Sequence, residues 1–150
     1  MGTRAQCIVV RGNKILVVRH RKRGEEWWCL PGGAVEEGET PAEAAVRELK
    51  EECRVDGTLI RETSFVTFAP DDKSATFLIE IGDQEPSLGY DPEDDEENRA
   101  LIDLQWKELF ELPEKDRVYV WMAGLLGTGE FLLEVSSWGD EISYPGKSDE

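Results

Sequence analysis

The sequence predicts one α/β (α+β) domain in which helices pack on a mixed β-sheet. The chain has 150 residues, which is close to the usual size of a single domain and is enough to bury a core without disulfides. Hydrophobic residues make up 39% and charged residues 33%, as in ordinary soluble globular proteins. Strand-like segments joined by hairpin turns lie on both sides of a helical segment, and no repeat or long linker divides residues 1–150.

The N-terminal part of the chain predicts β-structure. Residues 6–10 and 15–20 are rich in β-branched and apolar side chains, and residues 11–14 between them suit a tight hairpin turn. Residues 21–26 then predict a polar loop, and residues 27–30 predict a short apolar run that ends at a Pro-Gly-Gly sequence.

A helix is expected from about Pro41 to Cys53. Thr40 and Glu43 have the spacing of a capping box, with a proline at the first helical position. In such a box the threonine oxygen accepts a bond from a backbone N–H, and the glutamate reaches back to the cap. One apolar stripe then recurs at helical spacing, and it consists of Ala42, Val46, Leu49 and Cys53.

The rest of the chain predicts further strands and one more helix. The expected strands are residues 58–68, 75–81, 100–106 and 131–135, with turns at 70–72 and 109–112. A second helix is expected over residues 114–126, where the apolar side chains alternate at a helical period before a Gly-Thr-Gly sequence. The residues after Tyr144 are expected to form a loose tail.

The charge of the chain excludes several classes of partner. Asp and Glu number 33 against 17 Lys and Arg, which gives a formal net charge of −16. Duplex nucleic acid and anionic membranes need a basic face, so neither is expected as a partner. An anionic substrate would instead require a divalent metal held by some of these carboxylates. Three scattered cysteines and an N-terminus without an apolar signal sequence predict a reduced, cytoplasmic protein.

Three glutamates on the expected helix are the strongest candidates for metal chemistry. Glu48, Glu51 and Glu52 are related as i, i+3 and i+4, so their side chains share one helix face. Like charges at this spacing destabilise a bare helix by roughly 0.2–0.5 kcal/mol per pair. Hard cations would neutralise them, although such runs also occur on ordinary solvated helices. Arg47 can reach Glu43 or Glu51 at i±4 spacing.

The segment from Gly33 to Val55 resembles the Nudix box. That motif is Gly-x5-Glu-x7-Arg-Glu-U-x-Glu-Glu-x-Gly-U, in which U is aliphatic, and the segment matches all but one of its positions. The sequence from Trp28 to Gly33 and the surroundings of Trp106 also fit, so the resemblance extends over most of the chain.

The departure from the motif is Arg54, which stands where the family has glycine. That glycine usually ends the helix in the left-handed conformation. Arginine in this conformation costs roughly 1 kcal/mol relative to glycine. The alternative is that the helix end moves toward Gly57. In either case local stability and shape should change, because Arg54 is no metal ligand in the motif.

The resemblance implies a Nudix-type α/β/α sandwich with a mixed sheet, and an enzyme that hydrolyses a nucleoside diphosphate linked to another group. Arg47 matches the arginine that orients the carboxylates, and Gly33 and Glu39 match box positions that we assign to substrate binding. The implied cofactor is Mg²⁺, with Mn²⁺ as a substitute. The residues that match metal-binding positions are Gly32, Glu48, Glu51 and Glu52.

Divalent ions suit this reaction because they screen a pyrophosphate bridge, lower the pKa of a bound water and stabilise the leaving phosphate. A carboxylate then takes the proton of the water. The family uses either a box glutamate or a glutamate of a distal loop as this base. Residues 83–97 are strongly acidic and supply the loop candidates Glu93 and Glu97, of which we assign Glu97 to catalysis. A run of this kind is also typical of a solvated loop.

The sequence defines the substrate only as a small nucleotide. Trp28 or Trp27 can stack on a nucleobase, and Arg19 can meet phosphates, although core packing and solvation are ordinary roles for them. Pro70 has a spacing from Val55 that is associated with ADP-ribose hydrolases in the family, but it also suits a hairpin turn.

Two further hypotheses remain from the sequence. A Nudix-like module that senses a nucleotide without turnover is the alternative function. The apolar side chains within residues 131–138 can cover a sheet edge or form the contact of a homodimer.

Overall fold

Two four-stranded sheets and two α-helices form the computed structural model, which describes residues 2–89, 100–125, 128–129 and 133. The strands are β1 (Gly2–Ile8), β2 (Val10–Arg11), β3 (Lys14–Lys22), β4 (Glu25–Cys29), β5 (Gly32–Ala34), β6 (Thr58–Ala69), β7 (Asp72–Glu80) and β8 (Ala100–Lys107). The helices are α1 (Pro41–Cys53), the 3₁₀ turn η1 (Leu109–Glu111) and α2 (Glu114–Met122). No helix within these residues is long and apolar enough to cross a membrane.

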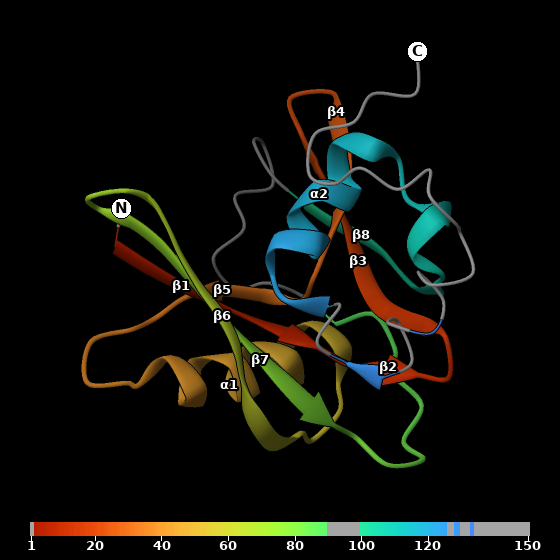
Figure 1. The fold of residues 1–150 in the computed structure, drawn as a ribbon, viewed down its shortest axis with the longest axis horizontal. Coiled ribbons are helices and arrows are strands. Elements are labelled where there is room, and N and C mark those ends of the chain that lie inside the picture. Colours follow the sequence, from red (N-terminus) through yellow and green to blue (C-terminus); the bar gives the residue numbers. More distant parts are fainter. Residues whose placement is uncertain (1, 90–99, 126–127, 130–132, 134–150) are drawn as a thin grey trace.

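The first sheet is mixed, as the sequence predicts, and has the order β5-β1-β7-β6 (Figure 1). Strands β1 and β7 are parallel, whereas β5 pairs with β1 and β6 pairs with β7 in the antiparallel sense. A parallel pair needs a long crossover connection, and here that connection contains α1.

The second sheet is antiparallel and is centred on β3, which pairs with β2, β4 and β8. The prediction of a polar loop over residues 21–26 is wrong, because β3 continues to Lys22 and β4 begins at Glu25. Only Arg23 and Gly24 form the turn, with φ values of 53° and 85°. Two positive φ angles are the pattern of a two-residue hairpin, and the charged side chains around it do not interfere with backbone pairing.

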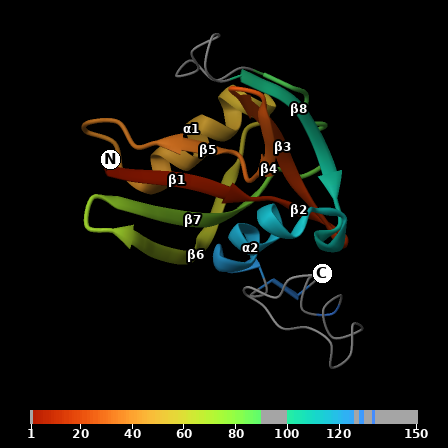
Figure 2. The same cartoon turned by 90° about the horizontal axis from the view of Figure 1, so that it is seen from above.

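Helices α1 and α2 lie on opposite sides of the first sheet (Figures 1 and 2). Alternate residues of β1 and β7 divide between the two layers. Ala5, Cys7 and Phe77 join Leu49 of α1 in one buried cluster. Ile8 packs in the other cluster, whose buried members from the C-terminal region are Leu109, Leu112, Val120, Ala123 and Leu125.

Helix α2 is shorter than the predicted helix over residues 114–126. It ends at Met122, and Gly124 follows with a φ of 94°. A glycine in this conformation commonly ends a helix, so Gly124 ends α2 earlier than the Gly-Thr-Gly sequence at 127–129 would. Several sequence-based predictions lie outside the described residues, namely Glu93, Glu97, the strand over 131–135, the dimer contact and the tail after 144.

Candidate active site

Helix α1 begins with the capping box that the sequence predicts. Thr40 Oγ1 accepts a bond from Glu43 N at 3.1 Å, and Glu43 Oε1 accepts a bond from Thr40 N at 3.0 Å. These bonds satisfy backbone donors that have no partner within the helix. The cap thereby uses the carboxylate of Glu43, and Arg47 bonds instead to Glu39 before the helix and to Glu51 one turn further along it.

Two of the three glutamates that match the metal-binding positions are buried beneath β5. Glu48 and Glu52 each have 0% of their surface exposed. Gly32 N donates to Glu52 Oε1 at 3.2 Å, and a Cβ atom at Gly33 would lie 2.4 Å from Glu48 Oε2. The missing side chain of Gly33 therefore lets the backbone of β5 approach Glu48 directly. Gly32 is needed for its contact with β1, because a Cβ there would lie 2.3 Å from Ala5 O and 2.7 Å from Gln6 Cα. The side chain of Glu51 lies at the margin of this cluster and is 24% exposed.

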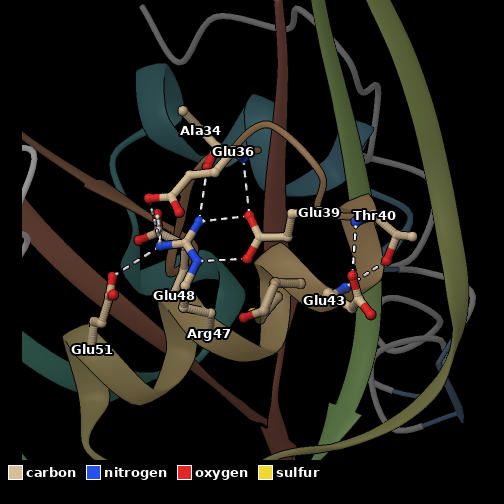
Figure 3. A network of polar contacts seen from close by, with 10 residues as sticks. Ala34, Glu36, Glu39, Thr40, Glu43, Arg47, Glu48 and Glu51 are labelled. Carbon is tan, nitrogen blue, oxygen red and sulfur yellow. Dashed lines mark hydrogen bonds and ion pairs between the residues drawn. The ribbon is translucent and has the colours of Figure 1, made fainter.

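The guanidinium of Arg47 joins the carboxylates of this region (Figure 3). Its Nη1 atom lies 3.2 Å from both Glu48 Oε2 and Glu51 Oε1. Its Nε and Nη2 atoms donate to the two oxygens of Glu39 at 2.7 and 3.0 Å, and Nη2 also donates to Ala34 O at 3.0 Å. Arg47 thus connects β5, the loop before α1 and the exposed margin of the glutamate cluster.

The charges of Arg47 and Glu39 reinforce each other. The hydrogen bonds from Arg47 hold the pKa of Glu39 below its usual value, so this carboxylate stays ionised to lower pH than a free glutamate. The same bonds to Glu39, together with the neighbouring carboxylates of Glu48 and Glu51, raise the pKa of Arg47 further above its already high usual value.

The donor set of the cluster fits a hard divalent cation. Carboxylate oxygens are the ligands that Mg²⁺ and Mn²⁺ prefer. Glu48 and Glu51 already converge on one positive group, the Nη1 atom of Arg47. Among the residues that the structure describes, no three His, Cys, Asp or Glu side chains surround a common point as ligands. Glu48, Glu51 and Glu52 would hold such a cation, and Glu39 holds Arg47 beside them through two hydrogen bonds. Gly32 contacts the cluster through its N–H group, and its role as a metal ligand stays a prediction.

Arg54 adopts the left-handed conformation that glycine usually takes at this position. Its φ and ψ are 59° and 38°, and its N–H donates to Lys50 O at 3.0 Å. The helix ends at Cys53, so the alternative of an end near Gly57 is wrong. Gly57 is needed for a different reason, because a Cβ there would lie 2.4 Å from Ile79 Cγ2.

A cavity of about 920 Å³ opens on the face of the first sheet opposite α1. Its floor consists of the polar residues of β1 and β7 that alternate with the core residues facing the helix. The site and the cavity are close, because a Cβ at Gly32 would lie 2.7 Å from Cα of Gln6, which lines the cavity. The lining residues are Arg4, Gln6, Glu25, Glu26, Trp27, Trp28, Cys29, Ser64, Val66, Phe68, Asp72, Ser74, Thr76, Lys115, Asp116, Tyr119, Met122 and Ala123.

Both tryptophans of β4 line this cavity and are half-buried. The ring of Trp27 stacks on the buried ring of His20, with centroids 5.8 Å apart. The ring of Trp28 lies beneath two cations, Arg19 at 5.5 Å and Lys107 at 4.9 Å. Arg19 also forms an ion pair with Glu26, and it lies outside the set that lines the cavity. The structure therefore places Trp28, but not Arg19, on the cavity wall.

Sequence reasoning did not single out the contribution of α2 to this cavity. Asp116 Oδ2 accepts a bond from Trp28 N at 3.0 Å, and Lys115 Nζ donates to Glu26 O at 3.1 Å. The two side chains therefore bond to backbone groups at the outer edge of β4 and hold this strand against α2. No local signal marks Lys115 and Asp116, since their role depends on a contact across 88 residues of sequence.

Comparison with known proteins gives the family of the chain. A model of the NUDIX domain matches residues 1–126. The uncharacterized Nudix hydrolase YvcI of Bacillus subtilis is 32% identical over 78 residues, which are 51% of this chain and 42% of that protein. The RNA pyrophosphohydrolase of Rhizobium meliloti is 40% identical over 67 residues, which are 44% of this chain and 37% of that protein. The matches thus span less than half the length of these curated relatives.

The fold has close counterparts among solved structures. The MutT NUDIX hydrolase of Burkholderia pseudomallei superposes with a TM-score of 0.61 at 22% identity, over 75% of this chain and 86% of that one. At this identity the likeness concerns the fold alone. The motif on α1, the extent of the domain match and the shared fold agree, and the chain belongs to the Nudix hydrolase family.

Proposed function

We propose that this protein hydrolyses the diphosphate bridge of a small nucleotide with the help of Mg²⁺. The substrate would be a nucleoside triphosphate or a nucleoside diphosphate linked to another group. The observation that carries this proposal is the burial of Glu48 and Glu52 against the glycines of β5, with Glu51 beside them at the surface. Buried carboxylates are costly for a fold, so a cluster of this kind favours a functional reason for its presence.

The residues of the cluster have separate tasks in this proposal. Glu48, Glu51 and Glu52 would hold the cation, which supplies charge screening for the phosphates and a water of lowered pKa. Gly32 N orients the carboxylate of Glu52 through its hydrogen bond. Glu39 holds Arg47 through two hydrogen bonds, so the guanidinium is kept beside the carboxylates that would hold the metal.

A carboxylate must also accept the proton of the attacking water. Glu52 is a candidate on α1, because it is buried and its orientation is fixed from β5. Glu93 and Glu97 are the alternatives from the acidic segment, and they lie outside the described residues.

The cavity beside β4 suits the nucleoside rather than the phosphates. Carboxylates from Glu25, Glu26, Asp72 and Asp116 outnumber the cations of Arg4 and Lys115 along its wall, so it repels additional negative charge. Aromatic side chains line the same wall and offer apolar faces to a flat base. We therefore place the base in the cavity and the phosphates at the glutamate cluster.

A hydrolysis screen with product identification tests the proposed function. The panel contains nucleoside triphosphates, oxidised nucleotides, ADP-ribose, nucleotide sugars and dinucleoside polyphosphates, each with and without Mg²⁺. We expect turnover of at least one class, and Glu52→Gln should lower kcat by about 10²–10⁴-fold. Glu43→Gln is the matched control, because it makes the same change on the same helix and glutamine also completes a capping box.

The outcome distinguishes the enzyme from a nucleotide sensor. If the folded protein binds both Mn²⁺ and a nucleotide but forms no product from any class, the hydrolase proposal fails and the sensor is favoured. The homodimer stays a separate prediction, and a monomer mass in light scattering at micromolar concentration would contradict it.

A further inference from the structure

Residues 82–89 follow β7 and run along the C-terminal end of α1; we call them the capping segment. Ser87 N donates to Cys53 O at 3.0 Å, and Gly89 N donates to Glu52 O at 2.7 Å. The last carbonyl groups of a helix have no partner within it, so this segment satisfies two of them on α1. It therefore contacts the backbone of the residues that carry the glutamate cluster.

The closest approach lies at Gly89. A Cβ atom there would lie 1.9 Å from Glu51 O, 3.0 Å from Glu51 C and 3.2 Å from Glu52 C. Real Cβ atoms do not come this close to a carbonyl oxygen, so any other residue at this position would displace either the capping segment or the end of the helix. Glycine is required here because the backbone of Gly89 lies directly against Glu51 and Glu52.

Arg11 fixes the start of the capping segment from the second sheet. Its Nη2 atom donates to Gly82 O at 3.0 Å and to Gln84 O at 2.8 Å, and its Nη1 atom donates to Glu85 Oε2 at 3.1 Å. Its guanidinium also lies 4.6 Å from the centroid of the Trp106 ring. A planar guanidinium can make these contacts together, whereas a lysine ammonium lacks the fork geometry.

Gln84 fixes the capping segment to the residues that follow α1. Its Oε1 atom accepts a bond from Asp56 N at 3.0 Å, and its Nε2 atom donates to Asp56 O and to Ile81 O at 2.8 Å each. Asp56 in turn pairs with Lys50 on the last turn of the helix, at 2.7 Å. The segment is thus held at its start by Arg11, in its middle by Gln84 and at its end by the helix carbonyls.

We propose that the capping segment positions Glu51 and Glu52 for metal binding, with Gly89, Arg11 and Gln84 as positioning residues. This inference rests on the proposed function, because it assigns these three residues a role in the same site. The segment sets the place of the backbone from which both carboxylates project, whereas Gly32 and Arg47 orient the carboxylates themselves.

The test compares two glycines that both pack closely near α1. Gly89→Ala would push on the backbone of Glu51, whereas Gly57→Ala would push on Ile79 and on Leu49, with a Cβ 2.4 and 3.0 Å from these side chains. Gly57→Ala therefore controls for loss of stability without a direct clash at the cluster. Each variant is measured for the Kd of Mn²⁺ by calorimetry, for Tm, and for kcat and KM with Mg²⁺ on the substrate class that the wild type turns over.

We expect Gly89→Ala to weaken Mn²⁺ binding about 10-fold and to lower kcat, as substitutions of residues that position metal ligands do. Gly57→Ala should lower Tm and leave the Kd of Mn²⁺ unchanged. Equal Mn²⁺ affinity in Gly89→Ala and wild type, at a retained fold, would overturn the proposal.

A second variant avoids the clash in case Gly89→Ala does not fold. Arg11→Gln removes the guanidinium fork at a half-buried position, and it should weaken Mn²⁺ binding in the same direction. Ser87→Ala keeps the backbone donor and should have no effect; unchanged Mn²⁺ binding in Arg11→Gln would also overturn the proposal. If the wild type hydrolyses nothing but Mn²⁺ binding still responds in this way, the proposed function fails and the positioning role stands.

Discussion

The glutamate cluster and the cavity beside β4 are separated by little more than strands β1 and β5, yet their side chains are held in different ways. In the cluster, Glu48 and Glu52 are fully buried, and Arg47 bonds to groups from three parts of the chain. In the cavity, two aromatic residues form what we call the rim, and they are about half exposed, with 48% for Phe68 and 59% for Tyr119.

This difference suits two tasks of one enzyme. Chemistry on a diphosphate bridge needs carboxylates that are placed before the substrate arrives, because reorganisation during the reaction raises the barrier. Recognition of a base tolerates aromatic rings that change their orientation, since stacking is favourable over a range of ring offsets and distances. We therefore expect changes in the cluster to affect all substrates alike, and changes at the rim to affect substrates according to their base.

Arg47→Lys should lower activity more than Phe68→Ala or Arg54→Gly. Lysine cannot bond to both oxygens of Glu39 and to the cluster at once, so the link across the site is lost. We expect kcat/KM to fall by about 10- to 100-fold, as for other residues that orient metal ligands. The measurement is kcat/KM with each substrate that the wild type accepts, and the fold-change should be the same for all of them. A loss of kcat/KM confined to substrates with one base would contradict the assignment of the chemistry to the glutamate cluster and of base recognition to the cavity.

Phe68→Ala should produce a smaller and base-dependent effect. The ring of Phe68 lies 6.5 Å from that of Tyr119 at the cavity rim, and we expect it to stack on a purine. Loss of stacking of about 1 kcal/mol corresponds to a KM about fivefold higher, with kcat unchanged. Phe65→Ala is the matched control, because Phe65 is 53% exposed on the same strand and lies outside the cavity lining. Equal KM values for the two variants would show that the rim does not select the base.

The same contrast explains what the sequence could predict. The capping box, the bounds of α1 and the shared face of its glutamates depend on geometry within one helix, so Thr40, Glu43 and the glutamate spacing predict them directly. The cavity wall draws on β1, β4, β6, β7 and α2, and contacts such as Asp116 with Trp28 depend on packing between them. The contact of Gly89 with α1 could not be predicted either, since a glycine within the acidic residues 83–97 gives no sign of the backbone that it contacts.

Arg54→Gly should have the smallest effect, and it concerns stability alone. The left-handed φ of 59° is strained for arginine and relaxed for glycine, while glycine also raises the entropy of the unfolded chain. The balance should raise the free energy of unfolding by about 0.5 kcal/mol, measured as a higher urea midpoint at an unchanged m-value. Arg54→Lys keeps both the charge and the strain and should leave the midpoint unchanged. Because Arg54 touches neither the carboxylates nor the cavity, kcat and KM should stay at wild-type values. A change in either parameter would mean that the strain at Arg54 also shifts the backbone of Glu51 and Glu52, so that the capping segment is not the sole control of their position at the end of α1.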